Sequence, residues 1–188
     1  LKDFIVELQV DDKRTFATTG GRAFDAMQPT VLLVHGAGMD HTVWVLQTRY
    51  FAHHGCNVLA IDLPGHGRSE GPALTSIGDV ADWLFRLLDA AGVEAAAVVG
   101  HSMGSLIALE LSARHPERVT TVALLSTTVP MAVSEELLSA AKCNDHDAID
   151  MITVWGHGPG AQLGGHKAPG LWMTGSTKRL LERADDGV

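Results

Sequence analysis

The sequence predicts an α/β protein with a mostly parallel sheet and helices on both faces. Four uninterrupted apolar runs support this prediction, because strands covered on both faces of a parallel sheet have this composition. They are residues 30–36, 57–65, 95–102 and 119–127. Helical patterns separate the later runs, and strands that alternate with helices indicate βαβ units with right-handed crossovers.

Composition limits the class of protein and its partners. The 188 residues, 46% of them hydrophobic, are enough to bury a full core. The net charge is −8 and no basic patch appears, which argues against a nucleic-acid partner. Cys56 and Cys143 lack the spacing of metal ligands, so we expect no disulfide framework, no metal and no cofactor.

No segment of the sequence resembles a targeting or membrane signal. Acidic residues interrupt the first thirteen residues, unlike the apolar region of a signal peptide. No later stretch reaches the roughly 18 apolar residues that a membrane span needs. We therefore expect a soluble cytoplasmic protein that binds a small molecule and no membrane; the oligomeric state is left open.

The elements follow one another in a clear order along the chain. Residues 4–10 and 15–18 predict a short antiparallel start. In residues 77–92, apolar side chains recur at three- and four-residue steps, as in a helix that packs one face on a sheet. A second helix follows Ser102, and Pro116 lies just beyond its expected end.

The character of the chain changes after Val129 and Pro130. Residues 134–143 and 145–155 predict two short helices, with Ser134 and Asp145 as N-caps. An irregular loop and a weaker helix at 171–184 follow, and no strand pattern returns. We therefore divide the chain into an N-terminal core, residues 1–129, and a helical cap, residues 130–188.

The segment Gly100-His101-Ser102-Met103-Gly104 points to nucleophilic chemistry. It fits the pattern G-x-S-x-G and lies between a buried strand and a helix, as that motif requires. A sharp turn there brings neighbouring backbones too close for side chains at the two glycines. Ser102 would then project above the strand ends, where the N-terminus of the following helix favours negative charge.

Two further segments follow strands of the same predicted sheet. His35-Gly36-Ala37-Gly38 ends the 30–36 run, and the N–H of Ala37 can join that of Met103 in a two-donor oxyanion hole. The segment from Asp62 to Ser69 is interpreted as structural, with Asp62 bonding local backbone in a tight turn.

The motifs HGAG, DLPGHGRS and GHSMG, in this order, resemble the α/β-hydrolase fold superfamily, in particular its bacterial single-domain serine hydrolases with a helical cap. The resemblance covers residues 31–129 and extends only loosely into the cap. It implies a nucleophile at Ser102 and oxyanion donors at Ala37 and Met103. Because position 102 is Ser rather than Asp, the epoxide hydrolase and haloalkane dehalogenase branches are disfavoured.

The same resemblance implies an acid and a His on loops after two further strands, which this sequence does not contain. The loop after the 119–127 run offers Ser126, Thr127 and Thr128 but no carboxylate. That run would form an open sheet edge, which natural proteins avoid. We therefore expect the chain to be an N-terminal part of a longer hydrolase that is inactive alone.

The histidines of the chain are interpreted as solvated or structurally bonded, because catalysis requires an imidazole about 3 Å from the serine hydroxyl. They are His146, His157 and His166 in the cap, His53, His54 and His115 near helix ends, and His35, His41, His66 and His101 near strand ends.

Together these features predict a hydrolase of small carboxylic esters or lactones that forms an acyl-enzyme at Ser102. Candidate substrate-binding residues are Trp44, Met131 and Trp155, with Met103, Leu171, Trp172 and Met173 as further apolar candidates. C–C bond hydrolase, thioesterase and perhydrolase chemistry use the same apparatus and remain alternatives. A non-catalytic ligand-binding or scaffold protein that keeps the turn without a working triad is the alternative from another class.

Overall fold

The computed structural model describes residues 5–25, 27–143, 146–161 and 173–184. It divides into two compact units, the first ending at Thr128 and the second beginning at Val129. We call them the core unit and the helical unit and describe each separately.

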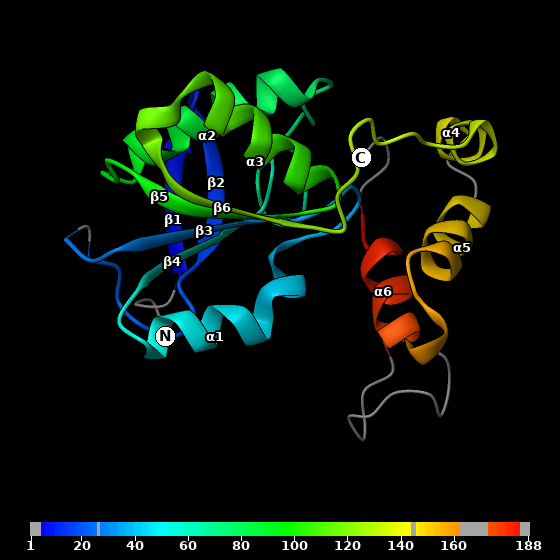
Figure 1. The fold of residues 1–188 in the computed structure, drawn as a ribbon, viewed down its shortest axis with the longest axis horizontal. Helices are drawn as coiled ribbons and strands as arrows, with labels where there is room; N and C mark the ends of the chain where they lie inside the picture. Colours follow the sequence, from blue (N-terminus) through cyan, green and yellow to red (C-terminus); the bar gives the residue numbers. More distant parts are fainter. Residues whose placement is uncertain (1–4, 26, 144–145, 162–172, 185–188) are drawn as a thin grey trace. The chain divides into compact units, whose positions relative to one another are not determined.

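The core unit is built on a six-stranded sheet with the strand order β1-β2-β4-β3-β5-β6 (Figure 1). The strands are β1 (Ile5–Val10), β2 (Lys13–Thr18), β3 (Thr30–Val34), β4 (Asn57–Ile61), β5 (Ala96–His101) and β6 (Val119–Leu125). The pairs β1–β2 and β2–β4 are antiparallel, and the pairs β4–β3, β3–β5 and β5–β6 are parallel. The predicted α/β fold with a mostly parallel sheet is thereby confirmed.

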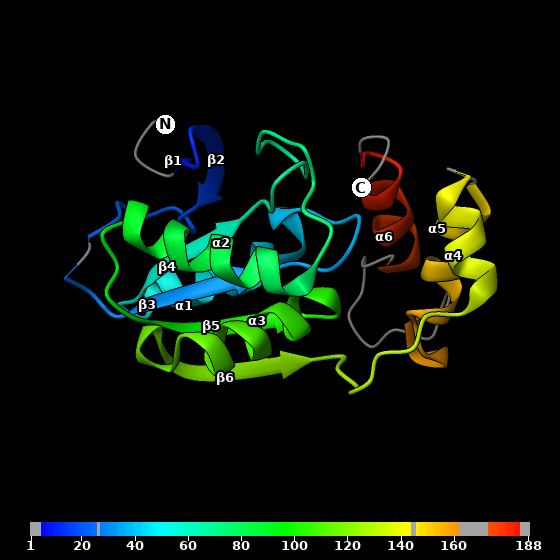
Figure 2. The same cartoon turned by 90° about the horizontal axis from the view of Figure 1, so that it is seen from above.

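Helices cover both faces of this sheet. Helices α2 (Ile77–Ala90) and α3 (Met103–Arg114) lie on one face, and α1 (Val45–His53) lies on the other (Figures 1 and 2). Two short 3₁₀ turns, η2 (His41–Trp44) and η3 (Pro116–Arg118), lead into α1 and β6. The sheet separates two apolar clusters, the larger one under α2 and α3 and the smaller one under α1.

Helix α2 follows the periodicity that the sequence predicted. Its side chains Leu84, Leu87 and Leu88 are fully buried in the larger cluster. Burying one such side chain contributes about 2 kcal/mol of transfer free energy. Ser76 caps the N-terminus of the helix, because its Oγ accepts a hydrogen bond from the N–H of Asp79 (3.0 Å).

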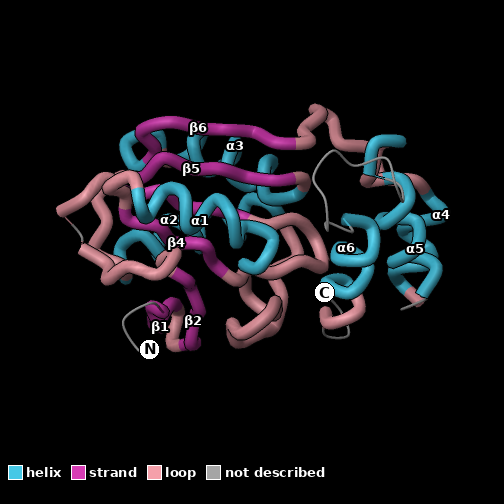
Figure 3. The backbone as a smooth tube through the Cα atoms, turned by 90° about the horizontal axis from the view of Figure 1, so that it is seen from below, coloured by secondary structure: helices cyan, strands magenta, loops and turns pink. Residues whose placement is uncertain are grey.

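Strand β6 forms the edge of the described sheet and pairs there with β5 (Figure 3). Its side chains Leu124 and Leu125 are 39% and 43% exposed. The sequence predicted a strand that is apolar on both faces, and within the described part of the chain those faces are largely open.

The helical unit contains α4 (Glu135–Lys142), α5 (His146–Trp155), the 3₁₀ turn η4 (Pro159–Ala161) and α6 (Met173–Leu181). The prediction that Ser134 caps α4 is confirmed, because its side chain accepts a hydrogen bond from the N–H of Leu137 (3.2 Å). Helix α5 joins α6 through the ion pair between Asp150 and Lys178. Several sequence candidates lie outside the described residues: Asp145, His166, Leu171 and Trp172.

Within the described ranges, every helix is too short or too polar to cross a lipid bilayer.

Candidate active site

Ser102 lies at the junction between β5 and α3, where the chain reverses direction sharply. Its backbone has φ 54° and ψ −122°, a conformation that a residue with a side chain rarely adopts. Three hydrogen bonds hold this strained backbone, one of them from the Oγ of Ser105 to the carbonyl of Ser102 (2.5 Å). The N–H of Ser102 donates to the carbonyl of Leu125 on β6, and its carbonyl accepts from the N–H of Ser105, each at 2.9 Å. The surrounding sheet and helix therefore fix the backbone of Ser102 and, with it, the direction of its Cα–Cβ bond.

Gly100 and Gly104 permit this turn because each lies against other backbone. A Cβ at Gly100 would lie 2.1 Å from the carbonyl oxygen of Gly104. A Cβ at Gly104 would lie 2.4 Å from the carbonyl oxygens of Val34 and His35. Real Cβ atoms do not approach backbone this closely, so the turn requires glycine at both positions.

The turn that follows β3 lies directly beside Ser102. A Cβ placed on Gly36 would be 3.2 Å from the Cβ of Ser102. The carbonyl of Gly36 accepts a hydrogen bond from the N–H of Met39 (3.2 Å), and Gly38 has φ +65°, so residues 36–39 form a tight turn. We call residues 36–39 the glycine turn. Ala37 is its second residue and is exposed.

A backbone donor directly follows Ser102 in the chain. Met103 is the first residue of α3, so its N–H has no carbonyl partner within the helix. The positive end of the helix dipole adds to the preference for negative charge there. Ala37 belongs to the glycine turn that packs against Ser102. The N-terminus of α3 therefore favours negative charge next to the serine hydroxyl.

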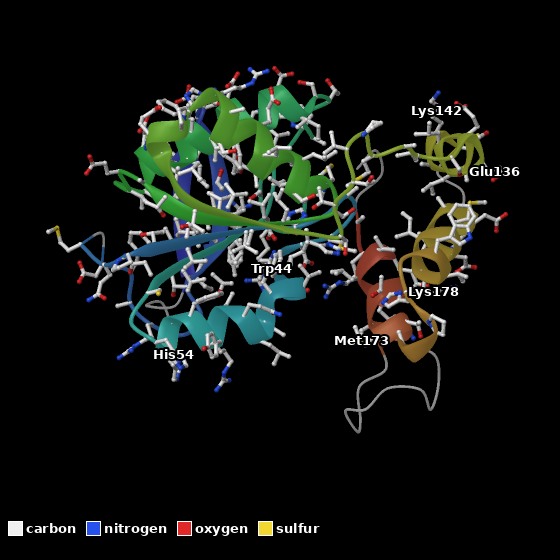
Figure 4. All side chains as sticks on the ribbon, in the orientation of Figure 1. Trp44, His54, Glu136, Lys142, Met173 and Lys178 are labelled. Carbon is white, nitrogen blue, oxygen red and sulfur yellow. The ribbon has the colours of Figure 1, made fainter. Side chains whose placement is uncertain are left out.

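His101 and Trp44 pack together next to the turn, on the α1 side of the sheet. Their ring centroids are 6.5 Å apart and the rings are nearly perpendicular. Burial lowers the pKa of His101, which keeps its imidazole neutral near pH 7. Figure 4 places Trp44 between the sheet and α1, where it is 4% exposed and its indole Nε1 has no partner among the described residues.

No imidazole of the described ranges is hydrogen-bonded to the Oγ of Ser102, and His101 packs against Trp44 instead. Several other histidines bond to backbone or to carboxylates, as expected from the sequence: His35, His41, His54, His66, His115 and His157.

Asp62 is fully buried and holds two loops together. Its Oδ2 accepts from the N–H of Arg68 (2.9 Å), which confirms the predicted bond to local backbone. Its Oδ1 also accepts from the N–H (2.7 Å) and the Nδ1–H (2.8 Å) of His41, a partner that the sequence did not indicate. Burial by itself raises the pKa of Asp62, but the hydrogen bonds from His41 and Arg68 outweigh it and hold that pKa below its usual value.

Asp40, His41 and Asp62 each bring one potential ligand atom within 4.8 Å of the others. Hydrogen bonds account for this proximity. Asp40 caps η2 through the N–H of Thr42, and Asp62 holds His41 and Arg68. The cluster therefore joins two loops, and it gives no reason to assign a metal.

The three substrate-binding candidates lie in different units. Trp44 belongs to the core unit. Met131 and Trp155 belong to the helical unit, where Met131 is half-buried and Trp155, at the end of α5, is 57% exposed. Their role in binding stays a prediction.

Known proteins of similar sequence include hydrolases. The chain is 35% identical over 126 residues to (E)-2-((N-methylformamido)methylene)succinate hydrolase of Acinetobacter baylyi, a match that covers 65% of the chain and 48% of that protein. It is 41% identical over 108 residues to pimeloyl-[acyl-carrier protein] methyl ester esterase of Chromobacterium violaceum, covering 57% of the chain and 40% of that protein. The chain thus spans about half the length, or less, of these relatives.

A solved structure agrees with the sequence comparison. Est816, described as an N-acyl homoserine lactone degrading enzyme, has a TM-score of 0.73 and 26% identity. The match covers 94% of this chain and 65% of that one.

A family model also matches residues 29–151, which include the glycine turn, the Asp62 loop and the turn at Ser102. The matched segment is more than half of the chain. With the strand order and the strained serine between β5 and α3, it shows that the chain belongs to the alpha/beta hydrolase fold family.

Proposed function

We propose that the protein is a serine hydrolase that cleaves a carboxylic ester or a lactone of a small molecule through an acyl-enzyme. The observation that carries this proposal is the backbone of Ser102, held at φ 54° at the start of α3 with the glycine turn beside it. Such strain persists only where surrounding structure enforces it, and it is concentrated at functional sites.

The proposed reaction begins with attack of the Ser102 Oγ on the substrate carbonyl while a base takes the hydroxyl proton. The N–H groups of Ala37 and Met103 stabilise the negative oxygen of the tetrahedral intermediate. Collapse expels the alcohol, or opens the lactone ring, and leaves an ester on Ser102. Water then attacks this ester and restores the serine. We propose that the base and its carboxylate partner come from outside the described residues.

The substrate class is supported by the relatives. One is named a methyl ester esterase, and a similar structure is described as degrading an acyl homoserine lactone. Hydrolysis of a methyl ester breaks a carbonyl–oxygen bond, and a lactone ring contains the same kind of bond. We propose that residues 130–188 form a cap segment, that residues 1–129 form the core, and that Trp44, Met131 and Trp155 contact the acyl part of the substrate. No cofactor is required for this chemistry.

Hydrolysis of p-nitrophenyl acetate and of an acyl homoserine lactone tests the proposal. It is measured for the 188-residue chain and for the product of the longest reading frame that contains it. Ser102→Ala should abolish turnover, whereas Ser112→Ala, which removes a hydroxyl at the other end of the same helix, should leave it unchanged.

We expect the protein encoded by the longest reading frame to be active and the 188-residue chain to show little turnover above background. Turnover that survives Ser102→Ala would refute the serine mechanism. If the protein encoded by the longest reading frame folds but hydrolyses neither substrate, the result would favour the alternative that it is a non-catalytic ligand-binding protein.

A further inference from the structure

His35 is a fully buried histidine at the end of β3, one residue before the glycine turn. Its Nε2 accepts a hydrogen bond from the N–H of Leu63 (3.0 Å), and its Nδ1 lies 2.8 Å from the carbonyl oxygen of Gly36. A backbone N–H can only donate, so Nε2 carries no proton and Nδ1 carries the one that Gly36 accepts. A single neutral tautomer satisfies both bonds.

The surroundings of His35 favour this neutral form. Burial lowers its pKa most, the carbonyl of Gly36 raises it, and the ring of His66, 5.0 Å away, lowers it again. The carboxylates of Asp62 and Asp40 raise it. The net result is a pKa of about 4, so the imidazole is a neutral hydrogen-bond acceptor at pH 7.

A second tether lies at the far end of the glycine turn. His41 donates from its N–H and its Nδ1 to the buried carboxylate of Asp62. Leu63 and Asp62 are adjacent in the loop after β4. Both ends of the segment from Gly36 to Asp40 are therefore attached to the same loop.

The attached segment is the one that packs against the serine. Gly36 approaches Ser102 so closely that a Cβ there would lie 3.2 Å from the serine Cβ. The N–H of Ala37 is joined to Gly36 through one peptide bond. The two tethers therefore restrain the turn that carries this N–H beside Ser102.

We propose that His35 is a positioning residue for the oxyanion donor Ala37, and that the pair His41–Asp62 is the second tether of the same turn. This inference rests on the proposed function, because Ala37 has an oxyanion to stabilise only if Ser102 attacks a carbonyl. The essential property of His35 is an acceptor at the position of Nε2. A displacement of about 1 Å in a catalytic group costs on the order of a hundredfold in rate.

The test uses the rate constant for modification of Ser102 by a fluorophosphonate, whose P=O oxygen occupies the position of the oxyanion. This rate constant is measured on the protein encoded by the longest reading frame that contains the chain. His35→Phe keeps a ring but removes the acceptor, and His35→Gln restores an acceptor oxygen near Nε2. His66→Gln is the matched control, because His66 is a buried neighbour that bonds within its own loop, to the carbonyl of Pro64.

We expect His35→Phe to slow labelling roughly ten- to a hundredfold, with His35→Gln and His66→Gln within about threefold of the wild type. Labelling of folded His35→Phe at the wild-type rate would overturn the inference. Equal losses in His35→Phe and His35→Gln would overturn it as well, because the acceptor would then not be the property that matters.

Two measurements keep the inference and the proposed function distinguishable. Nitrogen NMR of labelled histidine reports whether Nε2 of His35 is unprotonated at pH 7, independently of activity. If the wild type shows that tautomer but Ser102 is never labelled, the proposed function fails, and a positioning role fails with it. If Ser102 is labelled but Nε2 carries a proton, only the inference fails.

A pH profile provides a second route should His35→Phe not fold. Protonation of His35 removes the acceptor at Nε2, so we expect the ratio of the wild-type labelling rate to that of His35→Gln to fall as the pH approaches 4. Superimposable profiles would overturn the inference.

Discussion

His35 links the stability of the core unit to pH. Its pKa falls from 6.5 in the unfolded chain to about 4 in the fold, because burial disfavours the charged ring. Between these values the unfolded state binds a proton that the folded state does not. Stability from this group is therefore complete above pH 6.5 and is lost as pH falls toward 4.

The loss amounts to roughly 3 kcal/mol for His35 alone. Urea unfolding of the wild type at pH 7 and at pH 4.5 measures most of it, and His35→Gln should show a correspondingly smaller pH dependence. The same pH dependence in both proteins would mean that folding does not lower the pKa of His35.

A substitution at Gly104 tests how closely the backbone of the serine turn packs against the end of β3. Gly104→Ala places a Cβ against the carbonyl oxygens of Val34 and His35, and we expect it to cost at least about 2 kcal/mol. Gly92→Ala is the matched control, since Gly92 has φ +67° but no neighbour within 4 Å, so only backbone strain of about 1 kcal/mol applies. Urea unfolding measures the loss in free energy of unfolding for both variants. Equal costs would show that the backbone near Gly104 yields to a side chain.

At the scale of elements, the start of α2 depends on the cap at Ser76. Ser76→Ala removes the acceptor for the N–H of Asp79 and should lower the free energy of unfolding by about 1 kcal/mol. Ser112→Ala within α3 removes only a bond to the carbonyl of Leu109 and should be nearly neutral. Thermal unfolding of both variants measures the difference. Unchanged stability in Ser76→Ala would show that the Ser76 side chain does not stabilise the start of α2.

Strands β3, β4, β5 and β6 were predictable because the sequence is apolar on both of their faces. The sequence did not predict helix α1. Its residues that face the sheet, Thr48 and Ala52, are small or polar. Val45, Leu46 and Tyr50 are more than half exposed. An outward apolar face inverts the pattern by which a helix is recognised, so the position of α1 depends on tertiary structure.

At the scale of the whole molecule, the sharp turn at Ser102 was predictable from the sequence, but the two tethers of the glycine turn were not. Ser102 and its glycines are contiguous in the sequence, and the strain of the turn dictates their identity. The bonds from His35 to Leu63 and from His41 to Asp62 join residues 28 and 21 positions apart. No local pattern encodes them, because they exist only once β3 and β4 lie side by side.

The central claim is that the hydroxyl of Ser102 is a nucleophile flanked by two backbone donors. Peptide mapping by mass spectrometry after reaction of the longest product with a fluorophosphonate tests it most directly. The account predicts one adduct, on Ser102, that is lost in Ser102→Ala and kept in Ser112→Ala. A folded protein without an adduct on Ser102, or with its only adduct on another residue, would contradict it.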